Sequence, residues 1–508
     1  MRQTDVAPRP LPRLFQFSGN VHRPGVSTDK GVCVLVILGF AMVLTFMALI
    51  MTKRLTPMVA LILVPTVFGL FAGAGLGLGD MVLEALGSLA GTAALLMFAI
   101  LYFGIMIDVG LFDPLVRFIL RVAGGDPARV VVGTAILAAA VSLDGDGSTT
   151  FIVTTAAMLP IYLKLGISPV ILTCVAGLAN GTLNIVPWGG PTVRAAAALD
   201  VSATDIFVPM IPSLIVGLAV VLVFAWMMGV RERNRLAALG MTLADASGNG
   251  DLFPRAGSGT GKSGLAASGS HRGGILVPAL VRADTAPMPV ATEVLLDPVR
   301  DTLRPRLLWV NLGLTVLVMI LLVVDLLPLP FVFMVGSAVA LIINFPKLKD
   351  QGDRIAAHAP NIIAVVSMIL AAGVLIGVLN GTGMVDAMSS WLVTIIPDSL
   401  GPSLAVITGV LSIPMTFFMS NDAFYFGMLP VLAESASNFG ITPVEMARAS
   451  IIGQPVHLQS PLVPAFLLLV SLASVNLGDH HKKVLWRATV VALVMLVVGV
   501  VTAAIPFG

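Results

Sequence analysis

The chain has 508 residues, of which 57% are hydrophobic and 11% are charged, whereas an ordinary soluble domain is about 25% charged. Many apolar runs approach the roughly 20 residues that cross a bilayer, so the composition excludes a soluble globular protein and predicts an all-α polytopic membrane protein. The net charge of +2 and two cysteines in apolar segments, Cys33 and Cys174, give no indication of nucleic-acid binding, a disulfide framework or a metal cluster.

The first part of the chain is a polar segment followed by apolar spans. Residues 1–30 contain several Pro and Arg residues and are predicted to be a disordered N-terminal tail. Residues 31–230 form the first predicted transmembrane repeat. Its regular spans are expected at Gly31–Met51, Pro57–Gly77, Leu86–Met106 and Phe207–Met228, with a short interfacial helix at Leu111–Val122.

Within this repeat, the apolar arms Val130–Val141 and Phe151–Leu163 flank a polar, glycine-rich tip. Neither arm reaches the length of a span, so the pattern predicts a re-entrant hairpin over Val130–Leu163. Carboxylates at membrane depth persist mainly where they bind something or line a wet cavity. An extramembrane turn is the alternative, because Asp-Gly pairs favour turns. The candidate substrate contacts are Ser142, Ser148, Thr149 and Thr150, and the candidate metal-coupling or proton-coupling residues are Asp144 and Asp146.

A second irregular segment, Pro169–Leu199, is interrupted at Asn184–Thr192 by prolines and glycines. A half-helix that starts after such a break presents its positive end and favours an anion. Arg194 either forks onto a substrate carboxylate or forms a fixed ion pair with Asp144, Asp146 or Asp422, and the sequence leaves both open. The candidate substrate contacts here are Asn184, Gly189, Gly190, Thr192 and Arg194.

Residues 231–305 are dominated by Arg, Gly, Ser and Pro and are predicted to be a flexible cytoplasmic linker. Residues 306–508 form the second predicted transmembrane repeat. It is expected to contain spans at Leu307–Leu327, Phe331–Phe345, Ile362–Leu379 and Val484–Ile505, a second hairpin at Leu404–Leu432 and a second broken segment at Val444–Val475.

The second hairpin and the second break also carry polar residues. Ser420 and Asn421 are candidate substrate contacts, although both residue types are also preferred helix caps. His457 titrates in the physiological range and is a candidate proton carrier, with a satisfied buried histidine as the alternative. The remaining candidates are Asp422 for metal or proton coupling and Gln459 and Ser460 for substrate binding.

The two halves share landmarks at a constant offset in the numbering. Gly166-Ile167-x-Pro169-Val170 recurs as Gly440-Ile441-x-Pro443-Val444, which gives an offset of 443 − 169 = 274. Interrupted helices at matching positions of two halves indicate the binding site of a transporter. With the linker in the cytoplasm, most basic residues fall inside and most acidic loop residues outside, and each half has five spans, so the repeats are predicted to be inverted.

Several long motifs occur in an order that resembles the citrate–metal:proton symporters (CitMHS family) of the ion transporter superfamily. The motifs are Phe46–Leu55, Ala94–Asp108, Ser142-Leu-Asp-Gly-Asp-Gly147, Pro187-Trp-Gly-Gly-Pro191 and Ser420-Asn-Asp-Ala-Phe-Tyr425. The resemblance covers about Val34–Ile505 apart from the linker.

The resemblance implies a secondary active transporter that takes up citrate complexed with a divalent metal by proton symport. Mg²⁺ or Ca²⁺ would be a co-substrate and no cofactor would be permanently bound. The related fold implies an elevator-type transporter, in which the hairpin tips and breaks enclose the substrate in a domain that moves against a dimeric scaffold. The implied setting is the plasma membrane of a bacterium, with the citrate–metal complex, protons, lipid and a second copy of the chain as partners.

Other functions remain as alternatives. A sodium-coupled carboxylate symporter or an ion/proton antiporter of the same superfamily is the nearest, although sodium-coupled relatives commonly have Ser-Asn-Thr where this chain has acids. A membrane-embedded enzyme is not expected, because the sequence has no nucleophile–base arrangement and no H-E-x-x-H motif. A channel is disfavoured because paired hairpins indicate alternating access.

Overall fold

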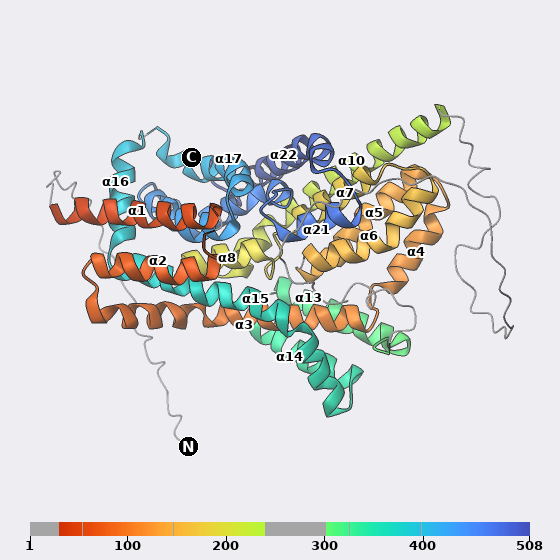
Figure 1. Ribbon diagram of the computed structural model, residues 1–508, viewed down its shortest axis with the longest axis horizontal. Helices are drawn as coiled ribbons and strands as arrows, with labels where there is room; N and C mark the ends of the chain where they lie inside the picture. The colour runs from red at the N-terminus through yellow and green to blue at the C-terminus, as the bar shows by residue number, and fades with distance from the viewer. Residues whose placement is uncertain are drawn as a thin grey trace, which may run out of the picture.

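The computed structural model describes residues 30–52, 54–145, 147–238, 301–324, 326–397 and 399–507. All regular structure in these ranges is helical (Figure 1), which confirms the predicted all-α class. Seven of the helices described are long and apolar enough to cross a membrane. Asp146, the predicted tail up to residue 29 and residues 239–300 of the predicted linker lie outside the described residues.

One group of helices is built around the two longest. α3 (Leu78–Asp108) has 31 residues and α15 (Leu348–Gly381) has 34, and each begins well before the span expected from hydropathy. They pack closely at Gly377, where an added Cβ would lie 2.6 Å from the carbonyl oxygen of Met81. Figure 1 shows that α2, α15 and α3 lie one beside the next, each running roughly parallel to the long axis. The other members are α1 (Lys30–Met51), α2 (Pro57–Phe71), α13 (Leu308–Val324) and α14 (Leu329–Asn344).

The second group contains the two predicted hairpins and the two broken segments. The arms of the hairpins are pairs of short helices, as predicted: α5 (Pro127–Val141) with α6 (Gly147–Lys164), and α17 (Leu404–Phe418) with α18 (Leu429–Ser437). A π-helical stretch, Ala423–Met428, precedes α18. The broken segments are α7 (Pro169–Leu183) with α8 (Gly190–Leu199), and α19 (Pro443–Ser450), α20 (Gln454–His457) and α21 (Pro464–Leu472). α9 (Ala203–Phe207), α10 (Ile211–Ala238) and α22 (Leu477–Val501) complete the group.

Short helices precede both hairpins. The predicted interfacial helix is α4 (Asp113–Ala123). A corresponding helix in the second half, α16 (Met384–Ile395), was not predicted. Asp386 is its one charged residue, so α16 lacks the alternation of charged and apolar residues that marks α4.

The two halves repeat structural landmarks at the offset seen in the sequence. The residue numbers at which α7 and α19 begin differ by 443 − 169 = 274, and those at which α8 and α21 begin differ by 464 − 190 = 274. Asp200 and Ser474, two non-glycine residues that both have a φ of 51°, differ by 474 − 200 = 274. Because a positive φ is rare outside glycine, this match is stronger evidence of a repeat than apolar identities.

The helices that end the two halves, α10 and α22, lie side by side in opposite directions. Gly217 near the start of α10 meets Met495 near the end of α22. Phe224, further along α10, contacts Trp486 near the start of α22, with 5.4 Å between ring centroids.

Each hairpin has its base beside the C-terminal end of one of these helices. Arg235 of α10 donates a hydrogen bond to the carbonyl of Gly166, just after α6, at 2.7 Å. Ser403, just before α17, donates to the carbonyl of Phe507, beyond α22, at 3.1 Å. Because α10 and α22 are antiparallel, the two hairpins enter the helical group from opposite ends.

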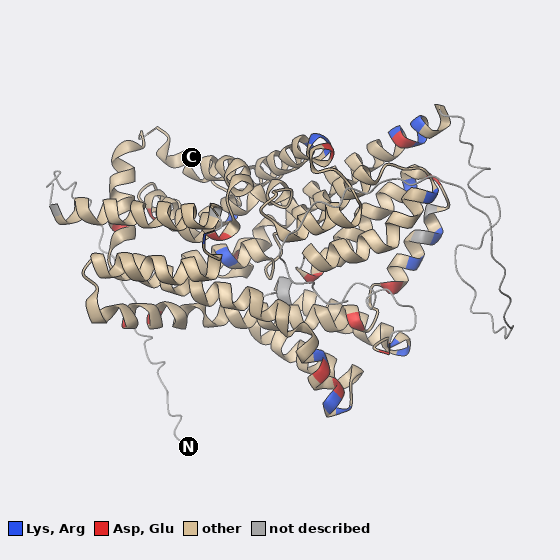
Figure 2. Ribbon diagram, viewed as in Figure 1, with Lys and Arg blue, Asp and Glu red and all other residues tan. Residues whose placement is uncertain are grey.

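Charge is separated along the long axis (Figure 2). Lys and Arg residues mark α4 and the end of α10, at the right of the view, whereas the start of α15, at the bottom of the view, carries both basic and acidic residues. Acidic residues mark the start of α3 and α16, toward the opposite end. This separation agrees with the distribution predicted by the positive-inside rule.

Candidate functional site

The first break is bonded to the tip of the first hairpin. The indole Nε1 of Trp188 donates to the carbonyl of Leu143 at 2.8 Å. Gly145 adopts a φ of 77°, and an added Cβ there would lie 3.1 Å from the Trp188 ring, so a larger residue would be both strained and crowded. Thr192 donates to the carbonyl of Ile185 at 2.8 Å and thereby closes the break itself.

The second break is bonded to its own hairpin in the same manner. His457 Nδ1 donates to the carbonyl of Thr416 at 2.6 Å, and Ser460 Oγ donates to the carbonyl of Phe417 at 2.6 Å. A carbonyl can only accept, so this contact places a proton on Nδ1, and Nε2 is the acceptor whenever the imidazole is neutral. In each half, the break thus satisfies carbonyls at the end of the first hairpin arm, where a helix has no internal donors.

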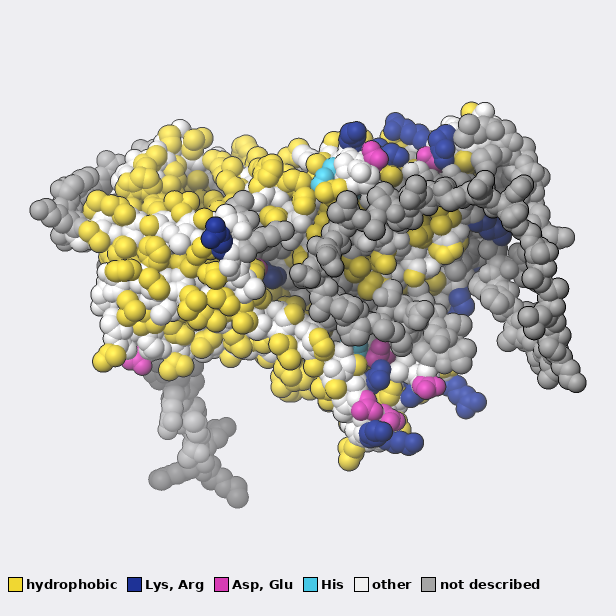
Figure 3. All heavy atoms as spheres, viewed as in Figure 1, with side chains coloured by type: hydrophobic (Ala, Val, Ile, Leu, Met, Phe, Trp, Pro, Cys, Tyr) yellow, Lys and Arg dark blue, Asp and Glu magenta, His cyan; other side chains and the backbone are white. Residues whose placement is uncertain are grey.

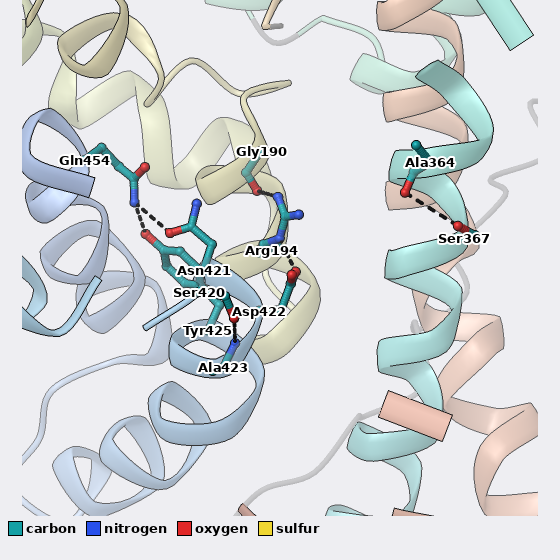
Figure 4. A network of polar contacts seen from close by, with 10 residues as sticks. All are labelled: Gly190, Arg194, Ala364, Ser367, Ser420, Asn421, Asp422, Ala423, Tyr425 and Gln454. Carbon is teal, nitrogen blue, oxygen red and sulfur yellow. Dashed lines mark hydrogen bonds and ion pairs between the residues drawn. The ribbon is translucent and has the colours of Figure 1, made fainter. Parts of the chain in front are cut away.

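The halves meet in an ion pair between α8 and the second tip. Arg194 Nε lies 2.6 Å from Asp422 Oδ1, and Arg194 Nη1 donates to the carbonyl of Gly190 at 3.1 Å (Figure 4). Both side chains are largely buried. Of the two roles that the sequence left open for Arg194, the structure contains the ion pair, with Asp422 as the partner.

An amide network lies beside this pair and also crosses between the halves (Figure 4). Asn184 Nδ2 donates to Gln454 Oε1 at 3.2 Å. Gln454 Nε2 in turn donates to Asn421 Oδ1 at 3.3 Å and to the Tyr425 hydroxyl at 3.0 Å. Tyr425 donates to the carbonyl of Ser450 at 3.3 Å.

Gln454 and Tyr425 were not among the predicted site residues. Gln454 lies in the predicted broken segment, three residues before His457, so its position was a usable signal. Tyr425 belongs to the π-helical stretch, and such stretches are frequent at functional sites but have no clear sequence signature.

The first tip is buried. Ser142 donates to the carbonyl of Ala138 at 2.6 Å and accepts from Asn180 Nδ2 of α7 at 2.8 Å. Asp144, at the end of the tip, is 5% exposed. Thr150 is fully buried, and its hydroxyl has no hydrogen-bond partner among the described residues. Ser148 and Thr149 occupy the first turn of α6 and are half-buried.

Two predicted substrate contacts have other roles in the structure. Ser420 accepts from the backbone N–H of Ala423 at 3.2 Å, which is the capping role considered as an alternative. Gln459 Oε1 accepts from His480 Nε2 at 3.1 Å, and Gln459 Nε2 donates to the carbonyl of Pro455 at 3.1 Å. His481 Nε2 donates to the backbone carbonyl of Gln459 at 2.8 Å. Gln459 therefore bonds the second break to α22 and does not take part in the network around Arg194.

The two broken segments cross without space between them. At Gly181 of α7, an added Cβ would lie 3.0 Å from Pro455 Cα and 3.1 Å from the Gln454 carbonyl oxygen. Gly189 is more restricted, since its added Cβ would lie 2.2 Å from the carbonyl oxygen of Asn184. Backbone atoms cannot move aside as a flexible side chain can, so Gly181 sets the distance between the halves, whereas Gly189 keeps the first break itself compact.

Replacing Gly181 with Ala is expected to lower the stability of the protein by about 1–3 kcal/mol, because the methyl group overpacks the crossing. Thermal unfolding in detergent measures the change. Gly87→Ala in α3 is the matched control, because nothing lies within 4 Å of its added Cβ. Equal melting temperatures for Gly181→Ala and Gly87→Ala would contradict the close crossing.

Two cavities, of about 370 and 470 Å³, lie elsewhere, where the end of α8 faces α3. They share Ser88, Ala197 and Asp200, and neither is lined by a predicted site residue. The charged residues that line them are acids, Glu84, Asp200 and Glu434, with no Lys or Arg among the lining residues, so we assign the candidate site to the tips and breaks, where buried charges of both signs and amides meet. Among the described residues, no three His, Cys, Asp or Glu side chains form a group that can hold a metal ion.

Comparison with known sequences gives close matches over nearly the whole chain. The profile of the citrate transporter family (CitMHS) matches residues 32–453. A Bacillus subtilis (strain 168) protein named "Citrate transporter" is 46% identical over 473 residues, which cover 93% of this chain and 100% of the relative. A second, named "Mg(2+)/citrate complex secondary transporter", is 44% identical over 472 residues, which cover 93% of this chain and 99% of the relative.

A third protein of the same organism, "Uncharacterized transporter YraO", is 42% identical over 472 residues, which cover 93% of this chain and 99% of the relative. Among solved structures, the crystal structure of the Alcanivorax borkumensis YdaH transporter aligns with a TM-score of 0.47 and 14% identity. The alignment covers 84% of this chain and 88% of that one.

Proposed function

The chain belongs to the citrate transporter family, and from this we propose that it takes up citrate as a complex with a divalent metal ion, together with protons. It is a multi-pass membrane protein and a transporter rather than an enzyme. The observation that carries the proposal is the ion pair of Arg194 with Asp422, at the point where the half-helix after the first break meets the second tip.

The charges of the site favour a metal complex over free citrate. Free citrate near neutral pH is a trianion, and burying it without compensation would be very costly. The described part of the site offers one cation, Arg194, against two buried carboxylates, Asp144 and Asp422. A bound Mg²⁺ or Ca²⁺ lowers the charge of the substrate to a single negative charge, and hard oxygen ligands suit these ions. The name of one close relative, a Mg(2+)/citrate complex transporter, supports the same substrate.

The ion pair also supplies a reason for coupling to protons. While Asp422 is ionised, its carboxylate is paired with the guanidinium of Arg194, with 2.6 Å between Oδ1 and Nε. A proton on Asp422 would weaken this pair and leave the planar fork of Arg194 to bind a carboxylate of citrate. Proton and substrate would then bind together, which is the requirement for symport.

We further propose that the halves are inverted repeats, that the site moves as an elevator against α3 and α15, and that the protein is a homodimer in a bacterial plasma membrane. The opposite entry of the two hairpins and the constant offset between matching landmarks support the repeats. Inverted repeats place a substrate site where their broken helices meet.

Removing divalent metal is expected to reduce citrate uptake to the level of empty liposomes. The test uses purified protein in proteoliposomes, an inward proton gradient and labelled citrate, with Mg²⁺, Ca²⁺, Ni²⁺ or Zn²⁺ added singly after chelation. Readdition of the preferred metal should restore uptake, and labelled metal should enter together with citrate.

Two results would contradict this function. Undiminished uptake of citrate in the presence of chelator would show that the substrate is free citrate. Uptake that follows a sodium gradient and ignores a proton gradient would identify a sodium-coupled symporter instead.

A further inference from the structure

A buried arginine outside the candidate site has no counter-charge in the part of the chain that the structure describes. Arg487 of α22 is 7% exposed, and its Nε has no hydrogen-bond partner among the described residues. Its guanidinium lies over the ring of Trp486, at 4.2 Å from the centroid, and 5.9 Å from that of Phe224. One guanidinium nitrogen, Nη1, donates to the backbone carbonyl of Lys483. A charged group at this depth is costly unless another charge compensates it.

The charges around Arg487 are also positive. Lys483 lies one helical turn earlier on α22, and Arg231 of α10 is near enough to Arg487 for their charges to repel. No ion pair in the described parts of the chain includes any of the three. Glu232, which follows Arg231, is already paired with Arg235 at 2.7 Å. The described residues therefore supply no paired anion to the cluster, which leaves it open to an anion from outside them.

The position of the cluster indicates what kind of anion reaches it. Figure 3 shows basic side chains gathered over the start of α22 and the end of α10. Toward its C-terminal end, α22 exposes an apolar stripe with one residue per turn, formed by Trp486, Val490, Leu493 and Val497. Trp486 is 50% exposed and Trp226 of α10 is 58% exposed. Exposed tryptophans beside basic residues at helix ends are typical of the boundary between lipid tails and headgroups.

We propose that Arg487, Lys483 and Arg231 bind the phosphate of an anionic phospholipid, whose acyl chains lie along the stripe of α22. A phosphate offers several acceptor oxygens, and the guanidinium fork and the ammonium group are its usual donors. A free phosphate ion presents the same oxygens but has no tails to cover the stripe, so the apolar surface favours the lipid. The site is separate from the substrate site and does not depend on which anion the protein transports.

The test measures lipid binding directly. Native mass spectrometry of the detergent-purified protein, titrated with phosphatidylglycerol or phosphatidylcholine of equal chain length, counts the lipids retained. The wild-type protein is expected to retain phosphatidylglycerol several-fold better than phosphatidylcholine. Arg487→Gln and Lys483→Gln should each abolish most of this preference, and Trp486→Leu should weaken retention of both lipids. Inorganic phosphate at millimolar concentration should not displace the bound lipid, because the ion lacks the contacts of the tails.

Lys482→Gln is the matched control, because it removes the same charge from the neighbouring, exposed position of α22. It should keep the wild-type preference. Should Arg487→Gln fail to fold, Lys483→Gln and Arg231→Gln carry the test. Equal retention of the two lipids by the wild type, or a preference that survives Lys483→Gln and Arg231→Gln, would overturn the proposal. Displacement of phosphatidylglycerol by inorganic phosphate would identify a general anion site instead of a lipid site.

Discussion

Arg194→Gln is expected to reduce citrate uptake by roughly 100-fold or more. The substitution leaves the carboxylate of Asp422 largely buried without the guanidinium that lies 2.6 Å away. Removing one partner of a buried ion pair costs about 3–5 kcal/mol, and each 1.4 kcal/mol corresponds to about a tenfold change in an equilibrium constant. Initial rates of labelled citrate uptake in proteoliposomes measure the loss, with the amount of folded protein determined in parallel by gel filtration.

Two further variants separate the structural role of Arg194 from substrate binding. In Arg194→Gln/Asp422→Asn no unpaired charge remains, so the protein should fold, and citrate should still bind poorly if Arg194 holds a substrate carboxylate. Arg194→Lys keeps the charge but loses the bidentate fork, so it should weaken citrate affinity substantially. If the double variant binds citrate with wild-type affinity, Arg194 does not contact the substrate.

Arg354→Gln is the matched control for this set. Arg354 is 3.5 Å from Asp108 in the group of helices around α3 and α15, and its side chain is partly exposed. Asp108 keeps a second partner, His358 Nε2 at 2.9 Å, when Arg354 is removed, so uptake by this variant should stay close to that of the wild type.

Asp144→Asn is expected to reduce uptake to a similar extent while leaving the protein folded. Asp144 is 5% exposed at a tip whose next residue, Gly145, turns the chain with a φ of 77°. Asparagine has nearly the same shape but carries no negative charge and cannot take up a proton at neutral pH, so it would weaken metal coordination and remove any proton coupling at this position. Uptake is measured at several Mg²⁺ concentrations, and the melting temperature in detergent reports folding.

Asp80→Asn serves as the control for Asp144→Asn, because Asp80 is an exposed acid at the start of α3. Its uptake should be unchanged. Wild-type uptake by Asp144→Asn would contradict a role of the first tip in transport and would favour the alternative that this tip is a simple turn.

The sequence was informative where the signal is local. Short apolar arms, a polar tip and a proline-rich break are contiguous patterns, and they located both hairpins and both broken segments. Apolar runs located the long helices but not their ends. The helix α15 starts at Leu348, well before the predicted span at Ile362, because its first turns are polar and lie beyond the apolar stretch.

The partners within the site could not be predicted, because they depend on tertiary packing. Asp144, Asp146 and Asp422 were all candidate partners of Arg194 in the sequence, and the approach of α8 to the second tip selects Asp422. Gln454 and Gln459 lie close together in the same break, yet one joins the network around Asn184 and the other bonds to His480. No sequence pattern distinguishes these two glutamines.

The ion pair between the halves has a consequence for biosynthesis. Arg194 and Asp422 are 228 residues apart in the chain, so at about 5–20 residues per second the ribosome needs roughly 10–50 s to supply the counter-charge after Arg194 has been made. Throughout that interval, a nascent α8 that entered hydrocarbon would carry an uncompensated guanidinium. The first broken segment must therefore wait close to water, or beside the insertion machinery, until the second hairpin emerges and allows both to settle together.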